Sequence, residues 1–380
     1  MKIDANSVTF EPQDMAFVKK FGILKATEMA LDYHAEHPNL PFLYDAEQLA
    51  GFLGISRGEL NDIVNHIQKE YKETRLPKKD GTYRSLCVPS IRLRFCQDPI
   101  KEKILPQLPV SKFATAYQKG STTRGNAEPH IGKKFLLKLD ITDFFGSVTF
   151  EQVQRTAFNT RYISRQVGYL LTSLCCKDDS LPQGAATSPA LSNIVMYRFD
   201  NYIGRWCGQR QIAYTRYCDD MTFSANRPLY GVYQKVKTML REMGFELNES
   251  KTHFIGNDNR QSVTGLVVNE KLSIPSGYKR DLRQEVYYAL KFGVEDSILH
   301  GHRSDFIEDG KPICCPTYML HLIGKVQYVL QIEPENLWFK DAQKKLLAYT
   351  YGHYSESLSY YLHFNKNGKG RGMYEQSSSV

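Results

Sequence analysis

Tyr217-Cys218-Asp219-Asp220 places two adjacent carboxylates between two short apolar runs, Ile-Ala-Tyr before them and Met-Thr-Phe after them. This pattern predicts a β-hairpin whose turn carries the acids, because Asp is disfavoured inside strands and tolerated in turns. Adjacent carboxylates repel each other unless a cation or solvent screens them. Taken alone, the pair is typical of a solvated hairpin tip, so a metal site requires a third ligand from elsewhere in the chain.

A third carboxylate, Asp140, ends a near-continuous apolar run at residues 135–140. Such a run predicts a buried strand with the acid at its C-terminal end. Nucleotidyl transfer at a divalent-metal site needs hard oxygen ligands from separate parts of the chain, around two ions about 3.5–4 Å apart. One strand end and one hairpin turn can supply these ligands. Asp140, Asp219 and Asp220 are therefore the predicted metal ligands and catalytic residues.

Between the two acidic sites, residues 181–189 read Leu-Pro-Gln-Gly-Ala-Ala-Thr-Ser-Pro. Gln183 and Gly184 leave an amide and bare backbone available to a ligand. Ser188, followed by a proline, predicts a helix N-cap and first turn. Apolar residues at every fourth position then predict one buried helix face: Leu191, Val195, Phe199 and Ile203.

The order of these motifs, over about residues 70–350, resembles the reverse transcriptases, and among them the bacterial retron reverse transcriptases. In that family Asp140 corresponds to the first catalytic acid and residues 217–220 to the acidic hairpin. Gln183 and Gly184 correspond to the segment under the template base and the incoming nucleotide. Cys218 stands where the commonest retron hairpin has alanine. A small, weakly polar side chain is compatible with activity, but it leaves nucleotide selection and fidelity open.

The resemblance also implies a deoxynucleoside triphosphate site. The basic segment around Lys79 and Arg84 is similar to the fingers hairpin, and these two residues would bind the β- and γ-phosphates. Phe145 stands where the family places an aromatic ring against the sugar, which would exclude a 2′-hydroxyl; the alternative is that Phe144 and Phe145 are core. Lys251 would assist the leaving pyrophosphate, and the alternative is a solvated lysine at a helix end.

Two short elements resemble the retron type in particular. Asn126 and His130 belong to an Asn-Ala-x-x-His element, and Val263-Thr264-Gly265 matches the retron Val-Thr-Gly element. The resemblance implies that they lie near the RNA or the primer end, where glycine permits close approach of the backbone. For His130, RNA contact and local structural support are both open.

If the chain is a retron enzyme, the resemblance implies a cognate structured noncoding RNA as partner. Part of this RNA would be copied into single-stranded DNA that stays joined to it through a 2′-hydroxyl. The resemblance further implies an effector protein encoded nearby and a role in antiphage defence. The expected cofactor is a pair of Mg²⁺ ions, for which Mn²⁺ can substitute, because hard octahedral oxygen sites favour these ions.

The expected fold class is α+β, with the right-hand polymerase architecture of fingers, a palm on an antiparallel sheet, and a helical thumb. The predicted domains are an N-terminal extension with fingers at 1–134, the catalytic palm at 135–270, the thumb at 271–364 and a flexible basic tail at 365–380. Helical periodicity is found within the fingers and thumb: 43–71, 93–105, 282–292, 318–330 and 337–349.

Composition agrees with a nucleic-acid enzyme. The chain has 380 residues and a formal net charge of +8, which favours a polyanionic partner. Its eight cysteines include no Cys-x-x-Cys, so Cys175-Cys176 and Cys314-Cys315 are expected to be buried thiols rather than zinc ligands. Without a signal-like segment or a run of about 18 apolar residues, the protein is expected in the cytoplasm and away from membranes.

Two rival functions remain open. The first is another bacterial reverse transcriptase, of the group II intron or abortive-infection type; the lack of an extension after the thumb argues against the intron type. The second is a non-catalytic RNA–DNA scaffold that restrains an effector. Retention of all three acids argues against such a scaffold, since binding a polyanion needs basic residues.

Overall fold

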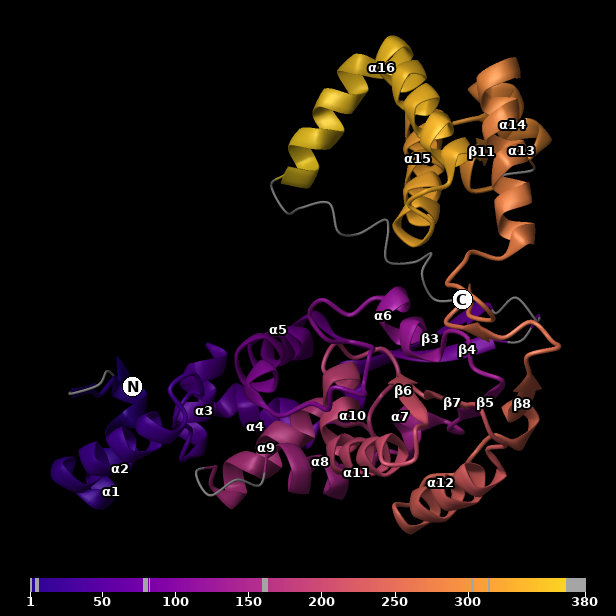
Figure 1. Cartoon of the computed structure of the whole chain (residues 1–380). Coiled ribbons are helices and arrows are strands. Elements are labelled where there is room, and N and C mark those ends of the chain that lie inside the picture. Colours follow the sequence, from indigo (N-terminus) through magenta and orange to yellow (C-terminus); the bar gives the residue numbers. More distant parts are fainter. Residues whose placement is uncertain are drawn as a thin grey trace. The chain divides into compact units, whose positions relative to one another are not determined.

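The computed structural model describes residues 2–3, 7–77, 81, 83–158, 163–301, 304–313 and 315–366, with side chains as far as Tyr354. Packing divides the chain into two compact units. The first comprises residues 1–122 and 135–254, and the second comprises 123–134 and 255–380. Figure 1 shows the first unit in indigo to red and most of the second in orange to yellow.

The N-terminal part of the first unit contains a short strand pair, β1 (Lys2–Ile3) and β2 (Val8–Thr9), followed by four helices. The helix predicted at 43–71 is in fact two helices, because Gly54 takes a left-handed φ of 73° and ends the first of them. Ser56 begins the next helix with a reciprocal capping box to Glu59. The four helices are α1 (Met15–Phe21), α2 (Ile23–Glu36), α3 (Ala46–Leu53) and α4 (Arg57–Asn65).

An antiparallel hairpin follows these helices. It is formed by β3 (Tyr71–Pro77) and β4 (Tyr83–Pro89). The Ser90 hydroxyl accepts a hydrogen bond from the Leu93 N–H and starts α5 (Ile91–Pro99), which continues as a π-helical turn through residue 104.

A four-stranded sheet has the order β6-β7-β5-β8, and its first three strands lie in the first unit. Its strands are β5 (Phe135–Asp140), β6 (Ala213–Tyr217), β7 (Asp220–Ala225) and β8 (His253–Gly256). The predicted buried strand and acidic hairpin are confirmed, since β5 and β6 each pair antiparallel with β7. Leu137 and Phe223 are fully buried, and burial of each such side chain contributes about 1.5–3 kcal/mol.

The remaining helices of the first unit share one apolar core with this sheet. They are α7 (Phe144–Ser147), α8 (Phe150–Ala157), α9 (Arg165–Cys175), α10 (Ser188–Val195), α11 (Tyr197–Gly208) and α12 (Tyr230–Glu242). Every residue of the predicted four-residue repeat is buried, but the face spans two helices that meet at Met196. The predicted N-cap at Ser188 is wrong, because its hydroxyl donates to the Pro182 carbonyl at 2.8 Å.

The second unit is mainly helical and contains the three helices predicted for the thumb. Its strands form two small hairpins: β9 (Ser262–Val263) with β10 (Leu266–Val267), and β11 (Ile307–Glu308) with β12 (Lys311–Pro312). Its helices are α6 (Thr123–Ala127), α13 (Ser276–Phe292), α14 (Val294–His300), α15 (Cys315–Ile332) and α16 (Leu337–Lys366), the last with a kink at Tyr354. The predicted tail lies outside the described residues from 367 on.

Cysteine burial largely follows the expectation. Cys175 and Cys176 are buried free thiols, and Cys315 is half-buried, while Cys314 lies outside the described residues. Among the described helices, none combines the length and apolar character that crossing a membrane requires.

Gly184 is expected to be indispensable for packing of the first unit. Its φ is +128°, and a Cβ there would approach the Cys87 carbonyl oxygen to 2.8 Å. Gly184→Ala is therefore predicted to lower the free energy of unfolding by about 1–3 kcal/mol, measured by urea denaturation. Gly208→Ala is the matched control, since a Cβ at Gly208 meets nothing within 4 Å. Equal unfolding midpoints for the two variants would contradict the close approach.

Candidate active site

The three predicted acids meet at one end of the central sheet. In the register of β5 and β7, Asp140 lies directly opposite Asp220. Asp219 lies in the turn before β7, and its carbonyl accepts a hydrogen bond from the Ile141 N–H at 3.2 Å. Directly paired residues on antiparallel strands have Cβ atoms about 4.5–5.5 Å apart. Strand pairing therefore brings together acids that are about 80 residues apart in the sequence.

The environment of Asp220 disfavours its negative charge. Asp140 is 5% exposed, whereas Asp220 is exposed. Partial removal of its carboxyl group from water, and then the negative charge of Asp219, raise the pKa of Asp220 to about 6. A bound cation would relieve this repulsion.

One cationic side chain already faces the acids. Lys251 Nζ donates to Asp140 Oδ2 at 2.9 Å, and this hydrogen bond raises the pKa of Lys251. Lys251 thus lies beside Asp140. It also ends a 3₁₀ turn, Glu249–Lys251, and its side chain is 59% exposed, as in the alternative of a solvated lysine.

The donor set fits a hard divalent cation, because it offers only carboxylate oxygens and no thiolate or imidazole. In the described part of the chain, no group of three or more His, Cys, Asp or Glu side chains is arranged to hold a metal ion as it stands. The Lys251 ammonium group donates a hydrogen bond to Asp140, so a metal ion bound to this carboxylate would compete with Lys251.

The sequence did not reveal two contacts that support the hairpin. The Tyr117 hydroxyl donates to Cys218 Sγ at 3.2 Å, which gives the cysteine a partner that alanine would lack. Arg216 Nη1 donates to the Cys218 carbonyl oxygen at 2.9 Å. The sequence does contain one indication of the second contact: Arg216 stands inside an otherwise uncharged strand, which indicates a buried acidic partner for it.

The remaining nucleotide-site residues are only partly brought together. The Gln183 carbonyl accepts from the Cys87 N–H at 2.7 Å, so the Gln-Gly segment packs along β4. Arg84 is exposed on the same strand, while Lys79 lies outside the described residues. Phe144 is core at 4% exposure, and Phe145 is half-buried against it, with ring centroids 5.7 Å apart.

The two short retron-like elements lie in the second unit and touch each other. Asn126 Nδ2 donates to Thr264 Oγ1 at 3.3 Å, across 138 residues of sequence. The Thr264 hydroxyl donates to the Thr123 carbonyl at 3.2 Å. Thr264 and Gly265 form the turn between β9 and β10, and both have positive φ, 45° and 80°.

His130 and Val263 are completely buried and Asn126 is 1% exposed, so little of their surface is available to a ligand. Burial, and then the charge of Lys133, lower the pKa of His130 to about 3, which keeps its ring neutral. These features agree with local structural support, one of the two alternatives left open for His130.

The chain is similar in sequence to known reverse transcriptases. The profile of the family "Reverse transcriptase (RNA-dependent DNA polymerase)" matches residues 76–268. Retron Mx65 reverse transcriptase of Myxococcus xanthus is 31% identical over 320 residues, covering 78% of this chain and 70% of that protein. Retron Ec86 reverse transcriptase of Escherichia coli is 29% identical over 270 residues, covering 70% of this chain and 84% of that protein.

The chain belongs to the retron-type reverse transcriptases. The α+β class with right-hand polymerase architecture and the RNA-directed DNA polymerase activity are thereby confirmed. Enzymes of this family copy an RNA template and use divalent metal ions. Among solved structures, telomerase from Candida albicans matches with a TM-score of 0.44 at 12% identity, covering 76% of this chain and 65% of that one.

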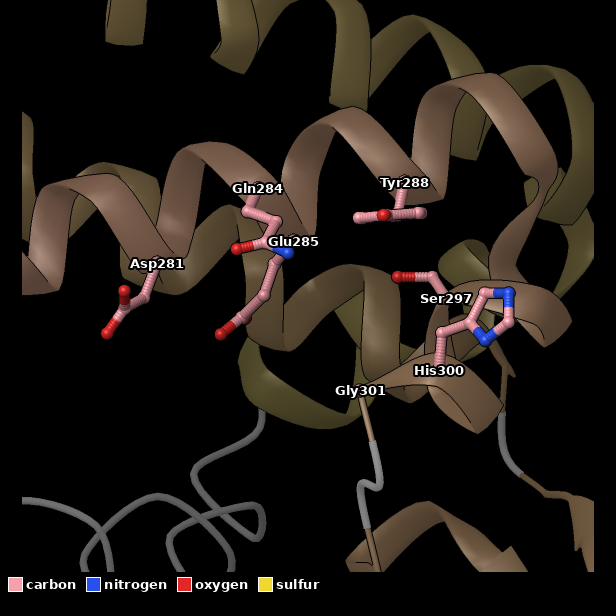
Figure 2. A pocket seen from close by; sticks show the side chains of 7 residues that line it. All are labelled: Asp281, Gln284, Glu285, Tyr288, Ser297, His300 and Gly301. Atoms are coloured by element: carbon pink, nitrogen blue, oxygen red, sulfur yellow. The ribbon is translucent and has the colours of Figure 1, made fainter.

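A separate cavity of about 380 Å³ lies in the second unit of this reverse transcriptase, between α13 and α14. Figure 2 shows its lining. One of its two carboxylates, Glu285, pairs with Lys325 at 2.8 Å. The cavity contains none of the three acids predicted as catalytic, which all belong to the first unit. The lining residues are Asp281, Gln284, Glu285, Tyr288, Ser297, His300 and Gly301.

The contact between the two retron-like elements predicts a difference between two substitutions of Thr264. Thr264→Val removes both hydroxyl hydrogen bonds, at about 1 kcal/mol each, whereas Thr264→Ser retains them. Amide hydrogen exchange of peptides covering 123–130 and 262–267 should be faster in the valine variant and unchanged in the serine variant. Unchanged exchange in both variants would show that the hydroxyl does not join the elements.

Proposed function

We propose that Asp140, Asp219 and Asp220 bind two Mg²⁺ ions and catalyse addition of deoxynucleotides to a primer. The cross-strand pairing of Asp140 with Asp220 is the observation that carries this proposal. When bound, the ions would lower the pKa of the attacking hydroxyl and neutralise the triphosphate. Mn²⁺ would substitute, since it also prefers hard oxygen ligands.

The protein's own contribution is to position the reactants and to neutralise charge. Lys251, already beside Asp140, would move to the leaving pyrophosphate once a cation occupies the acids. Arg84 and Lys79 would bind the β- and γ-phosphates, for which the planar guanidinium of Arg84 provides two parallel donors. Gln183 and Gly184 would support the template base and the incoming nucleotide.

The predicted domain boundaries become part of this proposal. The hairpin β3–β4 and the preceding helices would be the fingers, the β5–β8 sheet with its helices the palm, and the helices from α13 onward the thumb. The exposed face of the hairpin is rich in polar and basic side chains, which suits contact with phosphates.

The retron assignment extends to the mode of priming. The enzyme would start DNA synthesis from a 2′-hydroxyl of its own cognate noncoding RNA and leave the DNA joined to it. The hydrogen bond between Asn126 and Thr264 supports this proposal, because it connects the two elements that resemble the retron type. The RNA–DNA product and a neighbouring effector protein would act together in the cytoplasm in defence against phage.

The direct test is coexpression with the noncoding RNA encoded beside the gene. The expected product is a short single-stranded DNA that stays attached to RNA until a nuclease specific for 2′,5′ linkages releases it. Nucleic acid copurified with the protein would be sized and sequenced before and after this treatment. The Asp219→Asn/Asp220→Asn variant should bind the RNA and yield no DNA, because the metal ligands are lost while the basic surface remains.

The outcomes test the active site and the priming mode separately. DNA synthesis by the folded double variant would overturn the active-site assignment. Ordinary 3′-primed DNA alone would contradict the retron priming mode and leave the polymerase site intact. Thr264→Val should reduce DNA synthesis on the cognate RNA more than it reduces extension of an annealed DNA primer. An equal loss of activity on both substrates would count against a role of the Asn126–Thr264 contact in priming.

Phe145 gives a prediction about sugar selection. Phe145→Val is expected to admit ribonucleotides, because the smaller side chain would leave room for a 2′-hydroxyl. The measurement is the ratio of kcat/KM for a deoxynucleotide to that for its ribonucleotide, which should fall at least tenfold. The control is Phe254→Val, at an exposed aromatic position of β8. An unchanged ratio in Phe145→Val would mean that Phe145 is only a core residue.

A further inference from the structure

A fully buried ion pair supports the catalytic hairpin. Arg216 on β6 donates from Nε and Nη2 to the two carboxylate oxygens of Asp200 on α11, at 2.9 and 2.6 Å. Neither side chain has any exposed surface. The Tyr214 hydroxyl donates to the same carboxylate at 2.7 Å. A buried pair is costly to form, so the complete set of hydrogen bonds is needed to offset the loss of water.

The guanidinium also donates a hydrogen bond to the catalytic turn. Nη1 of Arg216 donates to the carbonyl oxygen of Cys218 at 2.9 Å. Cys218 has a left-handed φ of 60°, which costs a residue with a side chain about 1–2 kcal/mol. The next carbonyl, that of Asp219, is bound by the Ile141 N–H. The turn is therefore fixed at two consecutive peptide groups.

The arginine itself has little freedom to move. Its backbone N–H donates to the Phe113 carbonyl at 2.8 Å, and its own carbonyl accepts from the Thr115 N–H at 2.7 Å. Burial opposes the charge of Arg216, but the carboxylate of Asp200 outweighs it and raises the arginine pKa above its ordinary value. The guanidinium stays charged and in place throughout the working pH range.

We propose that Arg216 is a positioning residue for nucleotide addition: oriented by Asp200, it holds the Cys218 carbonyl and thereby sets the direction of the Asp219 and Asp220 carboxylates. This inference rests on the proposed catalytic role of these two acids. A displacement of a catalytic group by about 1 Å can cost on the order of 100-fold in rate. Loss of the carbonyl contact should thus affect turnover even when the fold survives.

The test uses variants that remove the carbonyl contact without leaving a lone buried charge. Arg216→Met/Asp200→Asn removes both charges and leaves an amide oxygen for the Tyr214 hydroxyl. Replacement of both members of a buried pair is usually tolerated, whereas removal of one is not. Arg216→Lys keeps a charge beside Asp200 but cannot form the fork and the Cys218 contact together. The control is Arg205→Met, at an exposed arginine of α11.

The assay is extension of an annealed DNA primer on an RNA template. It gives kcat, KM for the deoxynucleotide and the Mg²⁺ concentration at half-maximal rate, and thermal unfolding of each variant is measured in parallel. Both Arg216 variants should lose at least tenfold in kcat and require more Mg²⁺, with less than a threefold change in KM. Arg205→Met should match the wild type. If the double variant does not fold, the kcat and the Mg²⁺ dependence of the Arg216→Lys enzyme test the positioning role.

The outcomes distinguish this inference from the proposed function. A folded Arg216 variant with wild-type kcat and Mg²⁺ dependence would overturn the positioning role. Loss of stability with unchanged kcat per folded molecule would also overturn it, because the arginine would then be structural only. Activity in Asp219→Asn/Asp220→Asn, by contrast, would remove the catalytic site on which the inference rests.

Discussion

The cross-strand pairing of Asp140 with Asp220 is the constraint on which the site depends. Cross-strand pairing brings the Cβ atoms of two such residues to about 4.5–5.5 Å, and two like unit charges about 5 Å apart would repel by roughly 3 kcal/mol at an effective dielectric constant of 20, before solvent and counterions reduce the effect. Partial removal from water and the charge of Asp219 raise the pKa of Asp220, with a smaller contribution from Asp140, and Lys251 contacts Asp140. Such a cluster of charges is suited to binding cations.

The surrounding structure keeps these charges in place. The hydrogen bonds to the Cys218 and Asp219 carbonyls fix the turn from two directions, through Arg216 and through the end of β5. In the second unit, the Asn126–Thr264 contact fixes another strained turn in the same manner. Thr264 is held by a side chain of α6, and Cys218 is held by Arg216 of the same hairpin, which Asp200 on α11 orients. The geometry of both turns therefore depends on tertiary contacts.

The sequence predicted features that depend on local pattern. Apolar runs gave β5 and the acidic hairpin, and helical periodicity gave the main helices of the second unit. It failed where distant groups decide the local structure: the Ser188 hydroxyl bonds Pro182 instead of capping a helix, and the long fingers helix breaks at Gly54. The partner of Arg216 could not be read from the sequence either, since any of several acids could lie against β6.

The most direct measurement is a titration of the free protein with Mn²⁺, followed by electron paramagnetic resonance in the absence of nucleotide. The account predicts that the wild type binds Mn²⁺, that Asp219→Asn/Asp220→Asn binds it at least tenfold more weakly, and that Lys251→Gln binds it more tightly, because a competing cation has been removed from Asp140. Equal Mn²⁺ affinity in the wild type and the aspartate double variant would contradict the assignment of these carboxylates as the metal site.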